Sequence, residues 1–261
     1  MPSFPGRLKI LNLWVDPVTM GQALDRVVEF VETGDRAHAI FAVNPEKNYS
    51  VPKDPMLLES FRSADLLIPD GIGVVLAARF LHHAKLSRVP GVELMGRICR
   101  LAAEKGYGVF LFGADEEVSR KAAEVLLERY TGLRLVGRAN GYLRDEEMPG
   151  LVEQINASGA RILFLALGSP RQEHWYATHR DALKTVRVCQ GIGGTLDVVA
   201  GKVQRAPEIW CRYDAEWLYR LFSEPKRIRR QKVLPVFAAQ VFLAKMKNLF
   251  HGQDKTLRIG A

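Results

Sequence analysis

The 261-residue sequence lacks the features that mark several large classes of protein. Its three cysteines, Cys99, Cys189 and Cys211, have no metal-binding spacing and form no plausible disulfide set. No run reaches the roughly 18 apolar residues that a membrane-spanning helix needs. The N-terminus shows no signal-peptide pattern. These absences favour a protein of the reducing cytoplasm that is soluble or at most peripheral to a membrane.

Several catalytic motifs are also missing. The sequence has no early G-x-G-x-x-G, no Walker lysine motif, no G-x-S-x-G and no H-E-x-x-H. Its histidine pairs, His82–His83 and His174…His179, lack zinc spacing. The acidic D-x-D pair, with which many nucleotide-sugar enzymes hold a divalent metal, is absent too. If phosphate charge is to be offset, arginine side chains and helix N-termini have to do it.

The overall composition is that of a globular protein with a basic surface. Hydrophobic residues make up 48% and charged residues 25% of the chain. The length suits one large domain, or a domain with an appendage. A net charge of +8 favours a polyanionic partner such as nucleic acid, acidic lipid or a phosphorylated substrate. A generally basic, solvated surface is an equally good account of the charge.

Seven short runs rich in apolar residues predict strands. They are Leu8–Val15, Ala39–Val43, Asp65–Pro69, Gly108–Gly113, Leu133–Gly137, Arg161–Gly168 and Val186–Gln190. Several are continuously apolar rather than alternating, which is typical of strands buried on both faces of a parallel sheet.

Helical segments fit between these runs. Thr19 and Gln22 predict a capping box, and Asp54 before Pro55 predicts a second helix start. The segment from Asp115 carries acidic residues in its first turn and Arg129 in its last. The sequence therefore predicts an α/β fold, with helices on both sides of a mostly parallel sheet, over residues 1–202.

Residues 203–261 have a different texture, with many basic and aromatic residues and no strong strand signal. They predict a helical C-terminal appendage. Within it, a stripe at helical spacing contains Ala238, Phe242, Met246, Leu249 and Phe250. A basic cluster followed by an amphipathic helix favours contact with a membrane surface. Packing on the protein's own core and contact with another subunit are the alternatives.

Polar residues follow several of the predicted strands, where an open α/β sheet binds ligands. Asn44 and Glu46 follow one strand and Asp70 follows the next. A later strand leads into Gly168, Ser169, Gln172 and Glu173. The last leads into the turn "GIGGTLD", with its polar residues and with glycines that let backbone amides approach a phosphate.

Asp70, the "GIGGTLD" turn and Arg88, in "SRVPGVELM", each have a structural as well as a functional interpretation. Asp70 is either the N-cap of the helix that follows it or a general base. The "GIGGTLD" turn either cradles a phosphate or is a tight turn in which Thr195 caps the next helix. Arg88 either binds phosphate or is a solvated surface arginine.

Eight stretches match a known family in the same order along the chain. They are "VNPEKN", "ADLLIPDGIGVVLAARF", "RVPGVELM", "GVFLFGA", "GRANGYL", "INASGARILFLALGSPRQEHW", "GIGGTLDVVAGKVQRAPEIW" and "EWLYRLFSEPKRIRR". Together they resemble the WecG/TagA/CpsF family of bacterial glycosyltransferases. The resemblance covers nearly the whole chain. It implies a Rossmann-like fold and a C-terminal appendage that completes the active site and contacts membrane. It also implies inverting, metal-free transfer of a sugar from a UDP-sugar to a polyprenyl-diphosphate-linked sugar.

The resemblance implies a role for individual residues. Three residues are implied to be catalytic: Asp70 matches the base, Asn44 matches the asparagine beside the reacting sugar, and Gln172 matches the glutamine after the "LGSP" turn. The remaining candidates would bind substrate, with arginines on the diphosphate and the other residues near the nucleotide. They are Arg88, Arg220, Arg227, Arg230, Gly141, Tyr142, Gly168, Gly191, Gly193, Gly194 and Asp197.

Three positions depart from the family pattern. Ala42 stands where a threonine is usual, Glu93 replaces an aspartate, and Asp214–Trp217 reads "DAEW" in place of "GLEW". The loss of the hydroxyl at Ala42 bears on which sugar is accepted and leaves the reaction class unchanged.

The expected function is transfer of an N-acetylmannosamine-type sugar in cell-surface polysaccharide or teichoic acid synthesis, without a cofactor or nucleic-acid partner. The enzyme would act on the inner face of the plasma membrane, and its oligomeric state is left open. A UDP-glucose or UDP-uronic acid donor in exopolysaccharide assembly is the alternative within this class. A dinucleotide-dependent oxidoreductase and a non-enzymatic adaptor for membrane or nucleic acid are the alternatives outside it.

Overall fold

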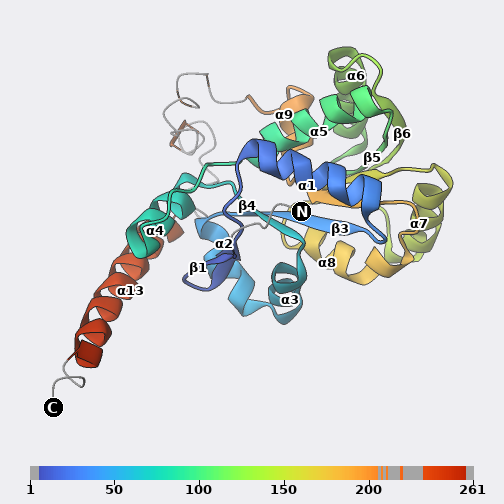
Figure 1. The fold of residues 1–261 in the computed structure, drawn as a ribbon. Coiled ribbons are helices and arrows are strands. Elements are labelled where there is room, and N and C mark those ends of the chain that lie inside the picture. The colour runs from blue at the N-terminus through green and yellow to red at the C-terminus, as the bar shows by residue number, and fades with distance from the viewer. Residues whose placement is uncertain (1–5, 205–206, 208–209, 211–217, 220–231, 257–261) are drawn as a thin grey trace.

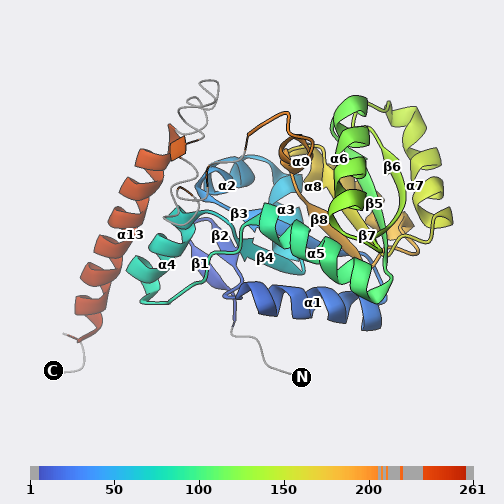
Figure 2. The same cartoon turned by 90° about the horizontal axis from the view of Figure 1, so that it is seen from above.

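A computed structural model of the chain describes residues 6–204, 207, 210, 218–219 and 232–256, with residues 249–256 described as helix backbone. Figures 1 and 2 show the arrangement of the elements in two views at right angles. The candidate residues Arg220, Arg227 and Arg230 lie outside the described residues, as does Asp214–Trp217.

The centre of the molecule is a six-stranded sheet in the order β4-β3-β8-β7-β5-β6. Every neighbouring pair in it is parallel. Its strands are β3 (His38–Val43), β4 (Leu66–Pro69), β5 (Gly108–Gly113), β6 (Arg134–Ala139), β7 (Ile162–Ala166) and β8 (Val188–Gly191). This confirms the α/β, Rossmann-like architecture with a mostly parallel sheet.

The first predicted strand, Leu8–Val15, is wrong as a single element. The chain forms two short antiparallel strands there, β1 (Leu8–Ile10) and β2 (Leu13–Val15). Between them Leu11 has a φ of 54°, a left-handed conformation that reverses the chain. The largely apolar pattern hides this turn because the segment has no glycine or proline to mark it.

Helices cover both faces of the sheet (Figure 1). One layer contains α1 (Met20–Thr33), α5 (Gly91–Lys105), α6 (Glu116–Arg129) and α9 (Thr195–Val199). The other contains α2 (Pro45–Ser50), α3 (Pro55–Ser63), α7 (Met148–Ala157) and α8 (Arg171–His179), with the short 3-10 turns η1 (Val51–Lys53), η2 (Asp145–Glu147) and η3 (Arg180–Ala182). The predicted helix starts are confirmed: Thr19 forms its capping box, and Asp54 and Asp115 cap α3 and α6.

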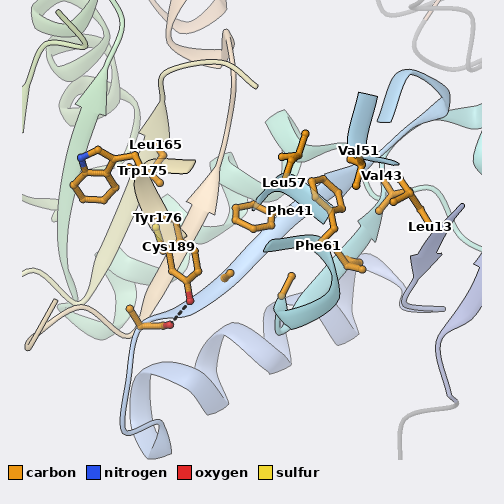
Figure 3. Packing of buried hydrophobic residues seen from close by; sticks show 14 of the residues in the cluster. Leu13, Phe41, Val43, Val51, Leu57, Phe61, Leu165, Trp175, Tyr176 and Cys189 are labelled. Atoms are coloured by element: carbon orange, nitrogen blue, oxygen red, sulfur yellow. Dashed lines mark hydrogen bonds between the residues drawn. The ribbon is translucent and has the colours of Figure 1, made fainter. Parts of the chain in front are cut away.

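Two hydrophobic clusters fill the space between the sheet and the helix layers. In one of them Phe41 of β3 packs against Phe61 of α3 and meets the ring of Tyr176 edge-on (Figure 3). The Tyr176 hydroxyl donates a hydrogen bond to the Ala37 carbonyl at 2.7 Å, so this buried polar atom has its partner. The packing fixes the positions from which the strand-end turns emerge.

Two further helices, α4 (Ile72–His82) and α13 (Val233–Thr256), lie side by side at one end of the molecule (Figures 1 and 2). Phe237 and Val241 of α13 are buried in the core, so one face of this helix packs on the protein itself. Ala238 and Phe242, which belong to the predicted stripe, are instead exposed. No helix in the described part of the chain is long and apolar enough to cross a membrane.

Candidate functional site

A cleft of about 1030 Å³ opens at the carboxyl ends of β3, β4 and β8, beside the turn that follows β7. It is lined by eight of the residues that the sequence singled out, namely Asn44, Asp70, Arg88, Gln172, Gly191, Gly193, Gly194 and Asp197. Parallel strands present their carboxyl ends at the same edge of the sheet, which explains why turns far apart in the sequence meet here.

Asp70 directly follows β4 and lies in the wall of this cleft. Its predicted alternative role as N-cap of α4 is wrong, because Gly71 holds that position and no side chain caps the helix. Asp70 Oδ1 instead accepts a hydrogen bond at 2.7 Å from the backbone N–H of Gly91, the first residue of α5. The carboxylate therefore lies at the N-terminus of a 15-residue helix, where negative charge is favoured.

Arg88 lies beside Asp70 and is half-buried. Its Nε donates a hydrogen bond at 2.8 Å to the backbone carbonyl of Asp70. Ala42 closes the same corner: a Cβ placed on Gly91 would lie 3.9 Å from Asp70 Oδ1 and 4.0 Å from Ala42 Cβ. The family position without its hydroxyl is thus next to the predicted base.

Asn44 follows β3 and caps α2, with its Oδ1 accepting a hydrogen bond at 3.1 Å from the backbone N–H of Lys47. The turn after β4 packs closely on it. A Cβ on Gly71 would lie 3.0 Å from Asn44 Cβ, and one on Gly73 would lie 2.7 Å from Pro45 Cγ. Glycine at these two positions lets the turns of adjacent strands touch.

Gln172 is buried in the first turn of α8. Its Oε1 accepts a hydrogen bond at 3.0 Å from the backbone N–H of Gly193, and its Nε2 donates one at 3.3 Å to Glu173 Oε1. A Cβ on Gly191 would lie 2.6 Å from Gln172 Nε2, so the side chain fills the space that this glycine leaves. Gln172 thereby joins the α8 turn to the turn after β8.

The turn after β8 uses several of its own backbone N–H groups inside the protein. Ile192 donates to Leu165, Gly193 donates to Gln172, and Thr195 donates to Ile192. Thr195 was expected to be the cap if the turn is purely structural, but Gly194 is the N-cap of the five-residue α9. A role of this turn in binding phosphate stays a prediction.

A second, smaller pocket of about 280 Å³ adjoins the cleft. It contains Gly141, Tyr142 and Gly168 and shares Gly193, Gly194 and Asp197 with the cleft. All of the predicted site residues in the described part of the chain thus line one pocket or the other.

The walls of the second pocket are charged and aromatic. Tyr142 is 74% exposed, and Arg171 donates a hydrogen bond at 2.7 Å to the Gly141 carbonyl. Lys202 Nζ lies 2.5 Å from Asp115 Oδ2. The hydrogen bond from Lys202 lowers the pKa of the Asp115 carboxyl, with a further contribution from the backbone N–H of Val118. The same hydrogen bond raises the pKa of Lys202.

Lys47 and Glu173, which both line the cleft, form an ion pair that was not predicted from the sequence. Lys47 Nζ lies 2.8 Å from Glu173 Oε1, and the side chains are 10% and 1% exposed. Both residues stand next to candidates in the motifs "VNPEKN" and "LGSPRQEHW". The signal available in the sequence was the presence of oppositely charged residues, Lys47 and Glu173, in these two strand-end turns.

The far end of the cleft is apolar. It is lined by residues of α4 and α13, including Ile72, Leu76, Phe80, Leu234, Phe237, Ala238, Val241 and Phe242. Leu76 and Phe242 are more than half exposed, so this end of the cleft runs onto an apolar surface. We call Leu76, Phe80, Val236, Phe242 and Leu243, the exposed apolar residues of these two helices, the apolar arm.

The described residues contain no group of three or more histidine, cysteine or acidic side chains that could hold a metal ion. The expectation of metal-free chemistry stays a prediction, and chelation tests it below.

The sequence matches the model of the glycosyl transferase WecG/TagA/CpsF family over residues 8–250. The chain belongs to this family. It is therefore a glycosyltransferase, and its membership in the family supports a role in cell-surface polysaccharide synthesis.

Membership in the WecG/TagA/CpsF family fits the chemistry of the cleft and of the second pocket beside it. Transfer of a sugar requires one site for the leaving group, one for the nucleophile and a group that takes up the nucleophile's proton. The second pocket is charged, the part of the cleft around Asp70 and Arg88 is polar, and the apolar arm is apolar, so the protein has three regions of different chemistry here.

Proposed function

We propose that this WecG/TagA/CpsF family member transfers an N-acetylmannosamine-type sugar from a UDP-sugar to a polyprenyl-diphosphate-linked sugar, with inversion and without a metal ion. The observation that carries the proposal is the position of Asp70. Its carboxylate is fixed by the N-terminus of α5 in the wall of a cleft that is partly lined by apolar residues and that shares Gly193, Gly194 and Asp197 with the second pocket.

In the proposed reaction Asp70 accepts the proton of the acceptor hydroxyl as the hydroxyl oxygen attacks the anomeric carbon. The bond from that carbon to the diphosphate oxygen breaks, and UDP leaves with the electron pair. A single displacement of this kind inverts the configuration of the sugar. The Gly91 N–H fixes the carboxylate through Oδ1, so little reorientation is needed when the acceptor arrives.

The second pocket suits the nucleotide. Tyr142 offers an exposed ring on which a base can stack. The turn with Gly193 and Gly194 lies in both pockets, so a diphosphate beside it would point the donor sugar towards Asp70. Arg88 lies next to Asp70, and we assign to it the stabilisation of the negative charge that grows on the leaving diphosphate.

The apolar arm suits the lipid-linked acceptor and the membrane that carries it. Leu76, Phe80 and Phe242 of the arm line the same cleft as Asp70, which would let a lipid-anchored sugar reach the base. Lys245 lies in the same region, with its Nζ 3.1 Å from His83 Nε2 and 5.8 Å from the centre of the Phe80 ring. Apolar and basic side chains together favour an interface with anionic lipid. We therefore propose a peripheral enzyme on the inner face of the plasma membrane.

The test is a donor screen with a synthetic polyprenyl-diphosphate-linked sugar as acceptor, in which UDP release is measured. UDP-N-acetylmannosamine is expected to give the highest rate, an inverted anomeric configuration in the product and no loss of rate in EDTA. Preference for UDP-glucose or a UDP-uronic acid would establish the alternative donor. No UDP release from any of these donors would contradict the proposal, as would a rate that EDTA abolishes.

A further inference from the structure

The ion pair between Lys47 and Glu173 connects parts of the cleft that the sheet alone keeps separate. Lys47 is in α2, after β3, and Glu173 is in α8, after β7. These two strands are not neighbours, because β8 lies between them. The pair therefore spans the carboxyl end of β8, whose following turn contains Gly193.

Stability alone is a poor explanation for this pair. Removing two charges from water offsets much of their mutual attraction, and apolar replacements of similar volume are often as stable. Both side chains are at least nine-tenths buried. Glu173 Oε2 is in addition buried without a hydrogen-bond partner among the described residues. A buried ion pair with this free-energy cost indicates that the two side chains are needed to hold neighbouring groups in position.

Hydrogen bonds extend from the pair to the predicted site residues. Glu173 Oε1, which faces Lys47 Nζ at 2.8 Å, also accepts the bond from Gln172 Nε2 at 3.3 Å. Gln172 Oε1 in turn accepts the N–H of Gly193 at 3.0 Å. On the other side, the backbone N–H of Lys47 donates to Asn44 Oδ1 at 3.1 Å. One continuous network thus joins the turns after β3, β7 and β8.

The space around the network leaves little freedom for its members to move. Gly191 is the residue beneath Gln172, and a Cβ there would lie 2.6 Å from Gln172 Nε2 and 3.0 Å from its Cδ. Lys47 Nζ also contacts Ser169 Oγ and lies 5.3 Å from the centre of the Phe61 ring. A shift of Glu173 would therefore be passed to Gln172 and from there to the Gly193 backbone.

We infer that Lys47 and Glu173 are positioning residues that fix Asn44 and the Gly193 turn against the donor substrate. Gln172, predicted from the sequence to be catalytic, belongs to the same positioning network because its amide oxygen already holds Gly193. The inference rests on the proposed function for its kinetic consequence. The structural part, control of the Gly193 turn by Glu173, does not depend on which reaction the cleft performs.

The first experiment compares Glu173→Gln with the wild type in two measurements. Hydrogen exchange of the Gly193 amide reports whether Gln172 still holds it. Steady-state UDP release reports turnover. We expect faster exchange at Gly193 and a kcat lower by about 10- to 100-fold, since small misplacements of positioning groups have effects of this size. The KM for the UDP-sugar should change less than kcat, because the pair itself has no predicted contact with the nucleotide and acts on the donor only through the Gly193 turn.

The double variant Lys47→Met/Glu173→Gln separates positioning from simple stability. Removing Glu173 alone leaves a buried lysine without its partner, whereas the double variant removes both charges. We expect the melting temperature to recover in the double variant while kcat stays low. Recovery of kcat together with the melting temperature would overturn the inference.

Asp65→Asn is the matched control, because Asp65 is a largely buried, paired carboxylate at the opposite edge of the sheet. It should lower the melting temperature and leave kcat and the exchange of Gly193 unchanged. Unchanged exchange at Gly193 in Glu173→Gln would overturn the inference whatever the reaction is. Absence of UDP release in the wild type would instead contradict the proposed function, and the exchange measurement would still decide whether Glu173 controls the turn.

Discussion

Strand β4 has an aspartate at each end, and the two carboxylates differ in almost every respect. Asp65, before the strand, accepts hydrogen bonds from both Nη atoms of Arg36 at 2.6 and 3.2 Å and from the Ala39 N–H at 2.9 Å. It also lies 3.0 Å from His38 Nδ1. Asp70, after the strand, has its Oδ1 on the Gly91 N–H and faces a cleft of about 1030 Å³.

The difference shows that the two ends of the strands in a parallel sheet have different surroundings. At the amino edge, side chains from adjacent strands and loops surround Asp65 and satisfy its oxygens, which is a structural role. At the carboxyl edge the chain turns away into helices, and the turns leave a space that a ligand can enter. The same residue type therefore has a structural role at one end of β4 and a predicted catalytic role at the other.

The largest expected effect is the contrast between Asp70→Asn and Asp65→Asn. Asp70→Asn should lower turnover by about 10²- to 10⁴-fold, the range for a positioned general base, and should leave UDP affinity nearly unchanged. Asp65→Asn should lower the free energy of unfolding by about 1–3 kcal/mol through lost buried hydrogen bonds, with little change in turnover. Kinetics and urea denaturation of both variants test this, and near-normal turnover in Asp70→Asn would return that residue to a structural role.

A second, smaller effect concerns the glycines of the carboxyl edge. Gly191→Ala places a Cβ 2.6 Å from Gln172 Nε2, so Gln172 has to move and turnover should fall by about 10- to 100-fold. Gly150→Ala in α7 is the control, because no atom lies within 4 Å of a Cβ there. In an exposed helical position that change should raise stability by up to about 1 kcal/mol without affecting turnover. Equal turnover in the two variants would show that the cleft tolerates a displaced Gln172.

The apolar arm provides a third comparison, between exposed apolar residues of the arm and an exposed leucine elsewhere on the surface. Leu76→Glu and Phe242→Glu should each weaken binding to anionic vesicles by about tenfold or more, because burial of such a side chain contributes about 1.5–3 kcal/mol. Leu127→Glu on α6 is the control, since Leu127 is 48% exposed but does not line the cleft. Vesicle co-sedimentation measures all three variants. Equal binding by the variants of the arm and of α6 would contradict membrane contact through the arm.

The smallest effect is expected for the exposed pair of Lys202 and Asp115 at the second pocket. The pKa of Asp115 is lowered in the folded state, so its contribution to stability is complete above the unfolded pKa of about 3.9. It is lost as the pH falls through the folded-state pKa. Lys202→Met should therefore lower the melting temperature slightly at pH 7, and the difference from the wild type should shrink in acid. A difference that persists unchanged at low pH would mean that the pair does not cause it.

Much of the site followed from reading where apolar runs end. The runs that became β3, β4 and β8 are followed by Asn44, Asp70 and Gly191, and all three line one cleft. This was predictable because continuously apolar strands indicate a parallel sheet, and parallel strands share a carboxyl edge. The helix caps at Thr19 and Asp54 were predictable for a different reason, because a cap bonds to residues two or three positions away.

Errors occurred where the partner lies far along the chain. Asp70 was weighed as a cap for α4, its immediate neighbour, yet its carboxylate accepts a hydrogen bond from Gly91, 21 positions away at the start of α5. Lys47 and Glu173 went unnoticed as a pair because 126 positions separate them. In both cases the sequence shows a polar residue at a turn and contains no local pattern that names its partner.

By itself the sequence determined the layered α/β fold, the strand ends at which polar residues gather and the membership of the family, because these depend on local periodicity and on motifs. The tertiary structure decided how those residues are used. The strand order β4-β3-β8-β7 placed Lys47 against Glu173 across the end of β8, and the approach of α5 gave Asp70 its fixed position. Such contacts depend on which strands become neighbours, and that is settled only when the whole sheet is packed between its two helix layers.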